Sequence, residues 1–279
     1  MSFTFQPIMK IIIEITEKIK NESIYDLSYY QKLLEDLLLK INNNKSKEKE
    51  LDLSNKNIDD DGAIELANYL RIQNKFNKIN IANNKISDNG VSALMKSLKS
   101  NTNITLTKIN IANNNISDNG VEAIAEILNT NTTLTEFDIS SNKISDNGLK
   151  ALMEALKTNI TLTKINIANN NISDNGVEAI EEILNTNTTL TEFDISSNKI
   201  SDNGLKALME ALKTNQTLKK FNISNNKIES KDEKNQSPYS ITKKTKPISF
   251  NSLISESKDE KNQSHTSIID NTKPISFSH

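Results

Sequence analysis

Serine and aspartate stand side by side in the recurring motif Ser-Asp-Asn-Gly, and a serine near a carboxylate can act as a nucleophile when a base activates it. Histidine is the usual base near neutral pH. The chain has only two histidines, His265 and His279, and both lie within its last fifteen residues. The motif occurs five times at regular spacing, which indicates a repeated turn rather than five active sites. We therefore predict no catalytic residue and no enzymatic activity.

Metal and cofactor chemistry also lacks the usual residues. The chain contains no cysteine, which excludes disulfides, thiolate–metal sites and cysteine catalysis. Arg71 is its only arginine, which argues against an arginine finger. We expect no bound cofactor and no bound metal.

Charge and hydropathy restrict the class of partner. The 279 residues carry 34 basic and 36 acidic side chains, a net charge of −2, so no basic footprint for nucleic acid or an anionic membrane is present. No apolar run reaches the length of a membrane span, and the first residues do not resemble a signal peptide. We expect a cytoplasmic protein, and leave open secretion as the effector of an intracellular microbe.

Glycine marks an internal repeat. All six glycines occupy one position of one motif, and the spacings between them are 28, 30, 28, 28 and 28 residues. The four prolines all lie outside this stretch. A fixed period of this length is typical of a solenoid built from one supersecondary unit. The glycines are Gly62, Gly90, Gly120, Gly148, Gly176 and Gly204.

Each unit combines two periodicities. In residues 134–161, Phe137 and Ile139 alternate with polar residues as in a short strand. Leu149, Leu152 and Leu156 then follow at the spacing of one helical face. Ser-Asp-Asn-Gly between the two parts supplies a turn and an oxygen to cap the helix. The unit is therefore predicted to be one strand followed by one helix.

The pattern L-x-x-L-x-L-x-x-N-x-L resembles the leucine-rich repeat family, specifically its ribonuclease-inhibitor-like class. The resemblance implies an α/β solenoid in which a curved horseshoe carries parallel strands on its concave side and helices on its convex side. Strands lie about 4.8 Å apart and helices about 8–10 Å apart, so stacked units must curve in that direction. The pattern matches residues 76–86 (with phenylalanine first), 106–116, 134–144, 162–172, 190–200 and 218–228.

The family also assigns a role to the asparagine of each unit. The resemblance implies that these side chains form a structural ladder, in which each amide makes hydrogen bonds to the backbone of neighbouring turns. We therefore expect them to hold the fold rather than a ligand. The predicted ladder comprises Asn84, Asn114, Asn142, Asn170, Asn198 and Asn226.

The residues that flank the buried strand positions are expected to line the concave surface. The first concave row is Glu50, Lys78, Lys108, Glu136, Lys164, Glu192 and Lys220. The second concave row is Asp52, Asn80, Asn110, Asp138, Asn166, Asp194 and Asn222. From Lys108 onward the first row alternates in sign, so neighbouring strands can form ion pairs, each worth about 0–1 kcal/mol if exposed.

Two interpretations of this face remain open: binding of a protein partner, and a generic solvated surface without tryptophan, tyrosine or arginine anchors. If it binds, the mechanism is polar complementarity, and exchanging Glu136 and Glu192 for lysine should abolish binding and leave the fold intact. The candidate binding residues are Lys108, Asn110, Glu136, Asp138, Lys164, Asn166, Glu192, Asp194, Lys220 and Asn222.

The repeat array, residues 48–229, has about six full units and a seventh strand, and it lies between two different ends. Residues 1–47 contain two amphipathic segments, predicted to form a helical cap or, alternatively, an independent partner-binding helix pair. Residues 230–279 form a polar tail, predicted to be disordered, with an internal 27-residue duplication. Its repeated Thr-Lys-Pro-Ile-Ser-Phe, at 245–250 and 272–277, is either a docking motif or an eroded strand. Because the C-terminal edge lacks a regular cap, we expect a mostly monomeric chain with weak self-association there.

These features favour a non-enzymatic scaffold that binds an unidentified protein through the repeat array. The ribonuclease-inhibitor-like class also contains arrays similar to those of Ran GTPase-activating proteins, so regulation of a small GTPase is the alternative. A microbial effector is a third hypothesis, compatible with the asparagine- and lysine-rich composition.

Overall fold

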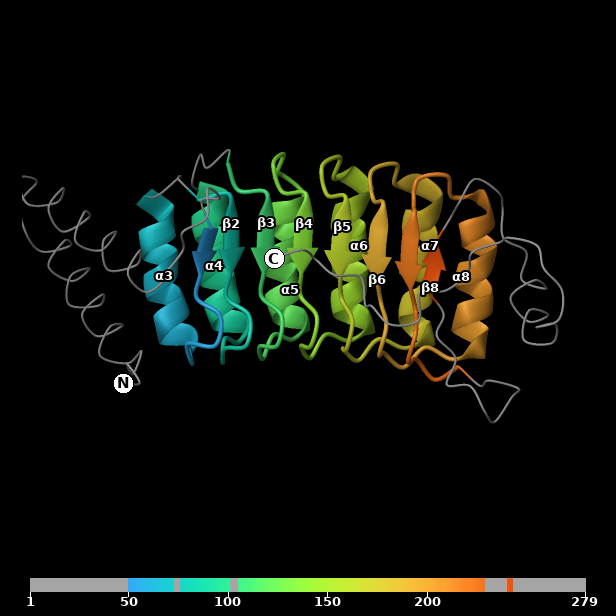
Figure 1. Cartoon of the computed structure of the whole chain (residues 1–279), viewed down its shortest axis with the longest axis horizontal. Helices are drawn as coiled ribbons and strands as arrows, with labels where there is room; N and C mark the ends of the chain where they lie inside the picture. Colours follow the sequence, from blue (N-terminus) through green and yellow to red (C-terminus); the bar gives the residue numbers. More distant parts are fainter. Residues whose placement is uncertain (1–49, 73–75, 101–104, 229–239, 243–279) are drawn as a thin grey trace, which may run out of the picture.

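The computed structural model describes residues 50–72, 76–100, 105–228 and 240–242 (Figure 1). In these ranges strands of three residues alternate with helices of three to four turns. None of the helices in the described ranges is long and apolar enough to cross a membrane. The elements are β1 (Glu50–Asp52), α3 (Asp60–Ile72), β2 (Lys78–Asn80), α4 (Asp88–Ser100), β3 (Lys108–Asn110), α5 (Asp118–Leu128), β4 (Glu136–Asp138), α6 (Asp146–Thr158), β5 (Lys164–Asn166), α7 (Asp174–Thr186), β6 (Glu192–Asp194), α8 (Asp202–Thr214), β7 (Lys220–Asn222) and β8 (Ser240–Thr242).

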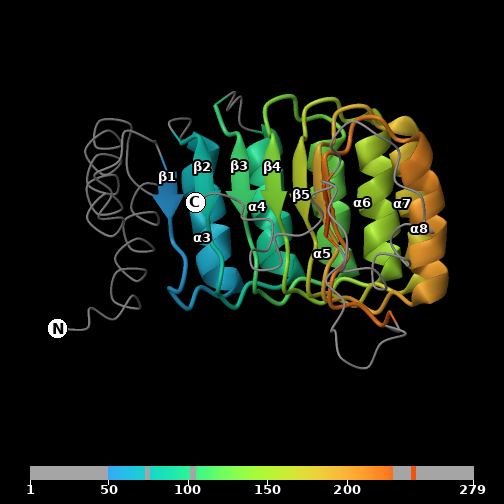
Figure 2. The same cartoon turned by 45° about the vertical axis from the view of Figure 1, so that its right-hand side comes forward.

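The strands form one sheet in chain order. Each strand from β1 to β7 pairs in parallel with the next, and the register advances by one whole repeat. All helices from α3 to α8 lie on one side of this sheet, and the other side is the concave face (Figures 1 and 2). The predicted solenoid of strand-and-helix units is confirmed.

The apolar positions of both periodicities meet between the sheet and the helices. Phe137 and Ile139 from the strand segment are fully buried, as are Leu149 and Leu152 from α6. Equivalent positions of the other units continue this core along the array. Burial of such side chains stabilises each unit by about 1.5–3 kcal/mol per residue, and the core depends on stacking because one unit alone cannot enclose it.

The chain leaves each strand through a tight polar turn. The Asn110 side chain accepts a hydrogen bond at 3.0 Å from the backbone N–H of Ala112. Asn113 then adopts a left-handed conformation with φ of 52°. Asparagine tolerates this region better than most residues because its short amide can bond locally. In this turn the array uses asparagine or serine where glycine would be the usual choice.

The Ser-Asp-Asn-Gly motif does more than the predicted turn. The Asp88 carboxylate accepts hydrogen bonds from the backbone N–H of Ser117 at 2.7 Å and from its hydroxyl at 2.5 Å. The equivalent aspartate at the start of each helix from α3 to α7, which in α3 is Asp60 of Asp-Asp-Asp-Gly, holds the serine that precedes the following helix. A Cβ atom on Gly120 would lie 2.6 Å from the same carboxylate. The glycine is therefore required by the close approach of the preceding repeat.

The two ends differ in how much the structure describes. The predicted helical cap, residues 1–47, lies outside the described residues, as do the motifs at 245–250 and 272–277. Within the tail, Ser240–Thr242 form β8, which pairs antiparallel with β7. The sequence did not predict this strand. It covers the edge of β7 that was expected to be available for self-association.

Candidate functional site

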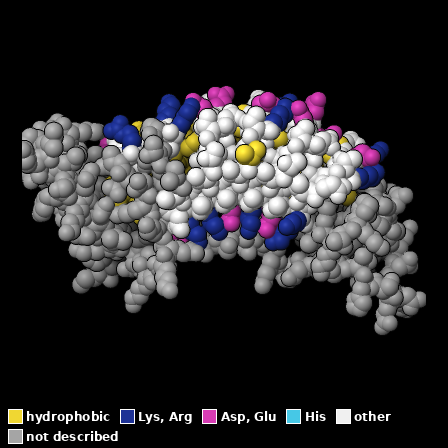
Figure 3. All heavy atoms as spheres, turned by 90° about the horizontal axis from the view of Figure 1, so that it is seen from above, with side chains coloured by type: hydrophobic (Ala, Val, Ile, Leu, Met, Phe, Trp, Pro, Cys, Tyr) yellow, Lys and Arg dark blue, Asp and Glu magenta, His cyan; other side chains and the backbone are white. Residues whose placement is uncertain are grey.

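The two concave rows lie where the strand periodicity placed them. In the register of β3 and β4, Lys108 lies opposite Glu136, Ile109 opposite Phe137 and Asn110 opposite Asp138. The middle residue of each strand is buried against the helices, so the residues on either side of it face the concave surface. Along the concave edge, basic and acidic side chains alternate in Figure 3.

The first concave row forms a continuous chain of ion pairs from β3 to β7. The distance from Lys108 Nζ to Glu136 Oε2 is 2.9 Å, and Lys164 Nζ lies 3.7 Å from Glu136 Oε1. Lys164 also approaches Glu192 at 3.5 Å, and Lys220 reaches Glu192 at 3.3 Å. The two glutamate side chains are only 13% and 12% exposed. The sequence predicted these pairs as exposed, whereas the structure places each glutamate in a largely buried position between two lysines.

The second concave row pairs carboxylates with amides. Asp138 accepts a hydrogen bond from Asn166 Nδ2 at 3.1 Å, and Asp194 accepts one from Asn222 Nδ2 at 2.9 Å. Burial raises the pKa of both carboxyl groups, and hydrogen bonds from Ser140 to Asp138 partly oppose that shift. The residues of this row therefore bind one another across strands. Because the carboxyl groups are buried, ionisation of each aspartate lowers the stability of the folded state.

The raised pKa predicts a specific pH dependence. Because the folded state binds these protons more tightly than the unfolded chain, the contribution of Asp138 and Asp194 to stability is highest below the unfolded pKa of about 3.9. It falls as the pH rises through the raised native pKa. We expect the wild-type chain to gain stability relative to an Asp138→Asn, Asp194→Asn variant as the pH falls from neutrality toward that unfolded pKa. Urea unfolding of both proteins at each pH measures this, and a difference independent of pH would contradict it.

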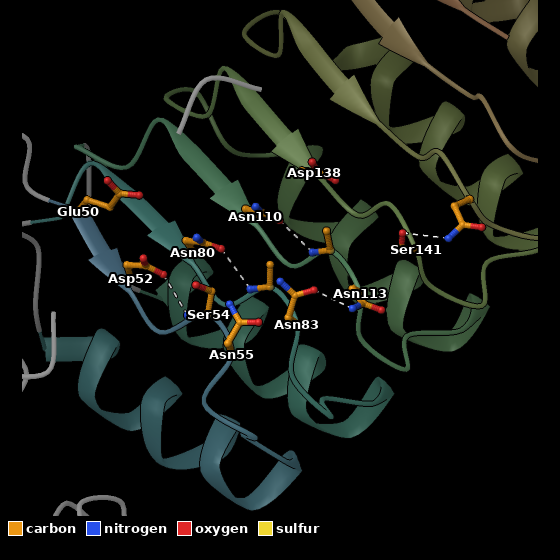
Figure 4. A pocket seen from close by; sticks show the side chains of 13 residues that line it. Glu50, Asp52, Ser54, Asn55, Asn80, Asn83, Asn110, Asn113, Asp138 and Ser141 are labelled. Atoms are coloured by element: carbon orange, nitrogen blue, oxygen red, sulfur yellow. Dashed lines mark hydrogen bonds between the residues drawn. The ribbon is translucent and has the colours of Figure 1, made fainter. Parts of the chain in front are cut away.

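A hollow of about 830 Å³ opens on the N-terminal half of the concave face (Figure 4). Its wall combines carboxylates, amides, hydroxyls and two alanines, without a lysine. The side chains of Asn83 and Asn113, in the turns that follow two neighbouring strands, lie side by side in its lining and are joined by a hydrogen bond of 2.7 Å. The lining residues are Glu50, Asp52, Ser54, Asn55, Asn80, Ala82, Asn83, Asn110, Ala112, Asn113, Asp138, Ser141 and Asn169.

Only part of the predicted site borders this hollow. Asn110 and Asp138 line it, whereas the remaining candidates belong to the ion chain and the amide pairs. The lining residues on β1 and β2 were not among the candidate binding residues, although they belong to the two concave rows that the sequence defined. The hollow is also lined by residues of the left-handed turns, such as Asn113, which the sequence analysis did not select. Each directly precedes a ladder asparagine, so the recurring Asn-Asn or Ser-Asn pair could have identified them.

The ladder asparagines lie behind the concave surface and make backbone contacts. Asn142 Nδ2 donates to the carbonyl groups of Ile139 at 3.0 Å and of Ile111, one repeat earlier, at 3.3 Å. Its Oδ1 accepts from the backbone N–H of Ile116 at 3.0 Å. The side chain is 8% exposed and joins two repeats. The others make equivalent contacts, Asn84, Asn114, Asn170, Asn198 and Asn226.

Comparisons with known proteins agree with this geometry. The leucine-rich repeat model matches residues 49–67, 74–95, 102–125 and 130–153, and the model of the TMOD/LMOD leucine-rich domain matches residues 149–273. No curated protein sequence matches the chain.

Solved structures with a similar fold include one described as actin-binding site 2 of leiomodin-1, at 24% identity and a TM-score of 0.47. That match covers 56% of this chain and 88% of the other. A tropomodulin C-terminal domain from Caenorhabditis elegans matches at 20% identity and a TM-score of 0.46, covering 56% and 92%.

The family matches say nothing specific about the ribonuclease-inhibitor-like class. The segments matched by the leucine-rich repeat model begin at residues 49, 74, 102 and 130, close to the repeat spacing described above. The chain belongs to the leucine-rich repeat proteins.

Proposed function

We propose that the chain is a non-enzymatic, cytoplasmic scaffold that binds a protein partner in the hollow over β1–β4. The hollow itself is the observation that supports this proposal. It presents 13 residues, mostly polar, to one concave space. Polar complementarity around such a surface favours recognition of one partner over others.

The C-terminal half of the concave face is less suited to binding. There, Glu136 and Glu192 are each engaged by two lysines, and Asp194 is engaged by Asn222. A partner would have to break or desolvate these pairs before it gained contacts of its own. The alternation of charge stops at β2 and β3, where Lys78 and Lys108 are register partners of the same sign. The site is therefore expected at the N-terminal end of the array.

An arginine at one of two equivalent positions tests this location. Ala112 lines the hollow, and Ala168 occupies the same position two repeats later, outside the lining. We expect Ala112→Arg to weaken the affinity for a captured partner by about tenfold or more, because its long charged side chain would occupy the hollow. The matched variant Ala168→Arg should change it by less than about twofold. Titration calorimetry with the purified partner measures both, and equal losses or no loss would place the site elsewhere.

Regulation of a small GTPase remains the alternative hypothesis from the sequence, and the comparisons add no support for it. A panel of small GTPases, assayed for GTP hydrolysis with and without the chain, separates a regulator from a plain scaffold. Actin belongs among the binding probes because it is the protein named with one of the similar structures. Stimulated hydrolysis that Ala112→Arg abolishes would replace the scaffold by the regulator.

A further inference from the structure

A second row of asparagines closes the helix-to-strand turns on the upper rim of the array. This rim carries mainly uncharged side chains between the charged helices and the charged concave edge (Figure 3). In each turn the asparagine is followed at the second position by threonine, which is the acceptor sequence for N-linked glycans. The row comprises Asn131, Asn159, Asn187 and Asn215.

The acceptor amides of this row are used by the fold. Asn159 Nδ2 donates to the carbonyl group of Leu128, at the end of the preceding helix, at 2.7 Å. Asn187 and Asn215 make the same contact one and two repeats later, at 2.8 and 2.7 Å. Since the last carbonyl groups of a helix have no partner within it, these amides satisfy them. The three asparagines are 4%, 8% and 7% exposed.

The opposite end of each amide is equally engaged. Asn159 Oδ1 accepts hydrogen bonds from the backbone N–H groups of Thr161 at 3.0 Å and Leu162 at 2.8 Å. The threonine hydroxyl of the acceptor sequence donates to the carbonyl group of Asn131, one repeat earlier, at 3.3 Å. Both residues that a glycosyltransferase must reach are therefore held inside the stack of turns.

Glycosylation would place a sugar where the array has no room for it. The transfer forms a bond between Nδ2 and the anomeric carbon of the sugar, breaks the bond from that carbon to a lipid-linked diphosphate, and releases one Nδ2 proton. The product must occupy the space beside a buried helix end. The glycosylated Nδ2 keeps one hydrogen, so at least one of the two carbonyl groups that it binds in the array, those of Leu128 at 2.7 Å and Asn131 at 3.4 Å, loses its donor.

We infer that the array folds only while Asn159, Asn187 and Asn215 are unmodified, so that the chain matures outside a glycosylating secretory route. N-linked transfer acts on these sequences while they are still unfolded, and it would block the turns that later enclose them. This inference concerns the route of folding and holds whichever partner the concave face binds.

The test produces the full chain in a eukaryotic host with a cleavable signal sequence, with and without an inhibitor of N-glycan synthesis. Site-specific mass spectrometry measures glycan occupancy, and limited proteolysis measures the folded array. We expect occupied asparagines and loss of the protease-resistant array without inhibitor, and a resistant array with it. The variant Thr161→Val, Thr189→Val, Thr217→Val keeps the buried amides but removes the acceptor sequences of these three asparagines and leaves that of Asn131, so it should have the three asparagines unoccupied and a resistant array without inhibitor.

Three outcomes would overturn the inference. The first is a protease-resistant array that carries a glycan on any of the three asparagines. The second is a sensitive array under the inhibitor, because the glycans are then not the cause. The third is a resistant, unmodified array without inhibitor, which would show that folding outruns the transferase in the secretory route.

Discussion

Replacing Asn142 by alanine is expected to lower the free energy of unfolding by about 2 to 4 kcal/mol. The substitution leaves the buried N–H of Ile116 without an acceptor, and the carbonyl group of Ile111 keeps only the amide of Asn114 as its donor. Each orphaned group costs about 1–3 kcal/mol. Because Asn142 joins consecutive repeats, the loss weakens the interface between them as well as one turn. Urea unfolding followed by circular dichroism measures the change.

The matched control for this prediction is Asn147→Ala in the same repeat. Asn147 is exposed, and only its backbone N–H makes a contact, to the hydroxyl of Ser145. We expect that variant to differ from the wild type by less than about 0.5 kcal/mol. Equal unfolding midpoints for Asn142→Ala and the wild type would refute the structural role of the ladder.

The charge reversal Glu136→Lys, Glu192→Lys is expected to destabilise the array by about 1 to 3 kcal/mol per site. The sequence alone favoured an intact fold for this variant. In the structure each glutamate lies largely buried between two lysines, so the exchange creates an unbroken run of five lysines across β3–β7. Like charges directly opposite on neighbouring strands repel one another, and the buried ones lose their counter-ions.

The control carries the same change of charge on the helix side. Glu122 and Glu178 are exposed, lie 56 residues apart and belong to α5 and α7. Glu122→Lys, Glu178→Lys should cost less than about 1 kcal/mol in total. Added salt should recover part of the stability of the concave variant because it screens the repulsion. A concave variant as stable as this control would show that the ion chain contributes nothing to the fold.

Much of the fold was predictable because its signals are local and repeated. Phe137 and Ile139 alternate at the period of a strand, Leu149 and Leu152 follow at the period of a helix, and the motif between them recurs. Repetition turned weak single-unit signals into a strong one. The register of the concave rows followed directly, because a parallel stack of identical units aligns equal positions.

The contacts between repeats could not be predicted in the same way. Asp88 was interpreted as part of a turn, but it bonds to Ser117 in the next repeat. Nothing near Asp88 in the chain reveals that partner, which lies 29 residues away. The hollow and β8 were missed for the same reason, since both depend on which segments meet in space.

The amino-acid sequence by itself determined the periodic unit, the order of the strands, the rows that face the concave side and the absence of cysteine chemistry. These properties depend on residue type and spacing along the chain. The tertiary structure alone decided which polar groups are engaged. Stacking buries most of the glutamates of the ion chain, the ladder amides and the three asparagines Asn159, Asn187 and Asn215, and it leaves a hollow over β1–β4. Burial and pairing arise from the approach of neighbouring repeats, and it is their desolvation that separates structural polar residues from those available to a partner.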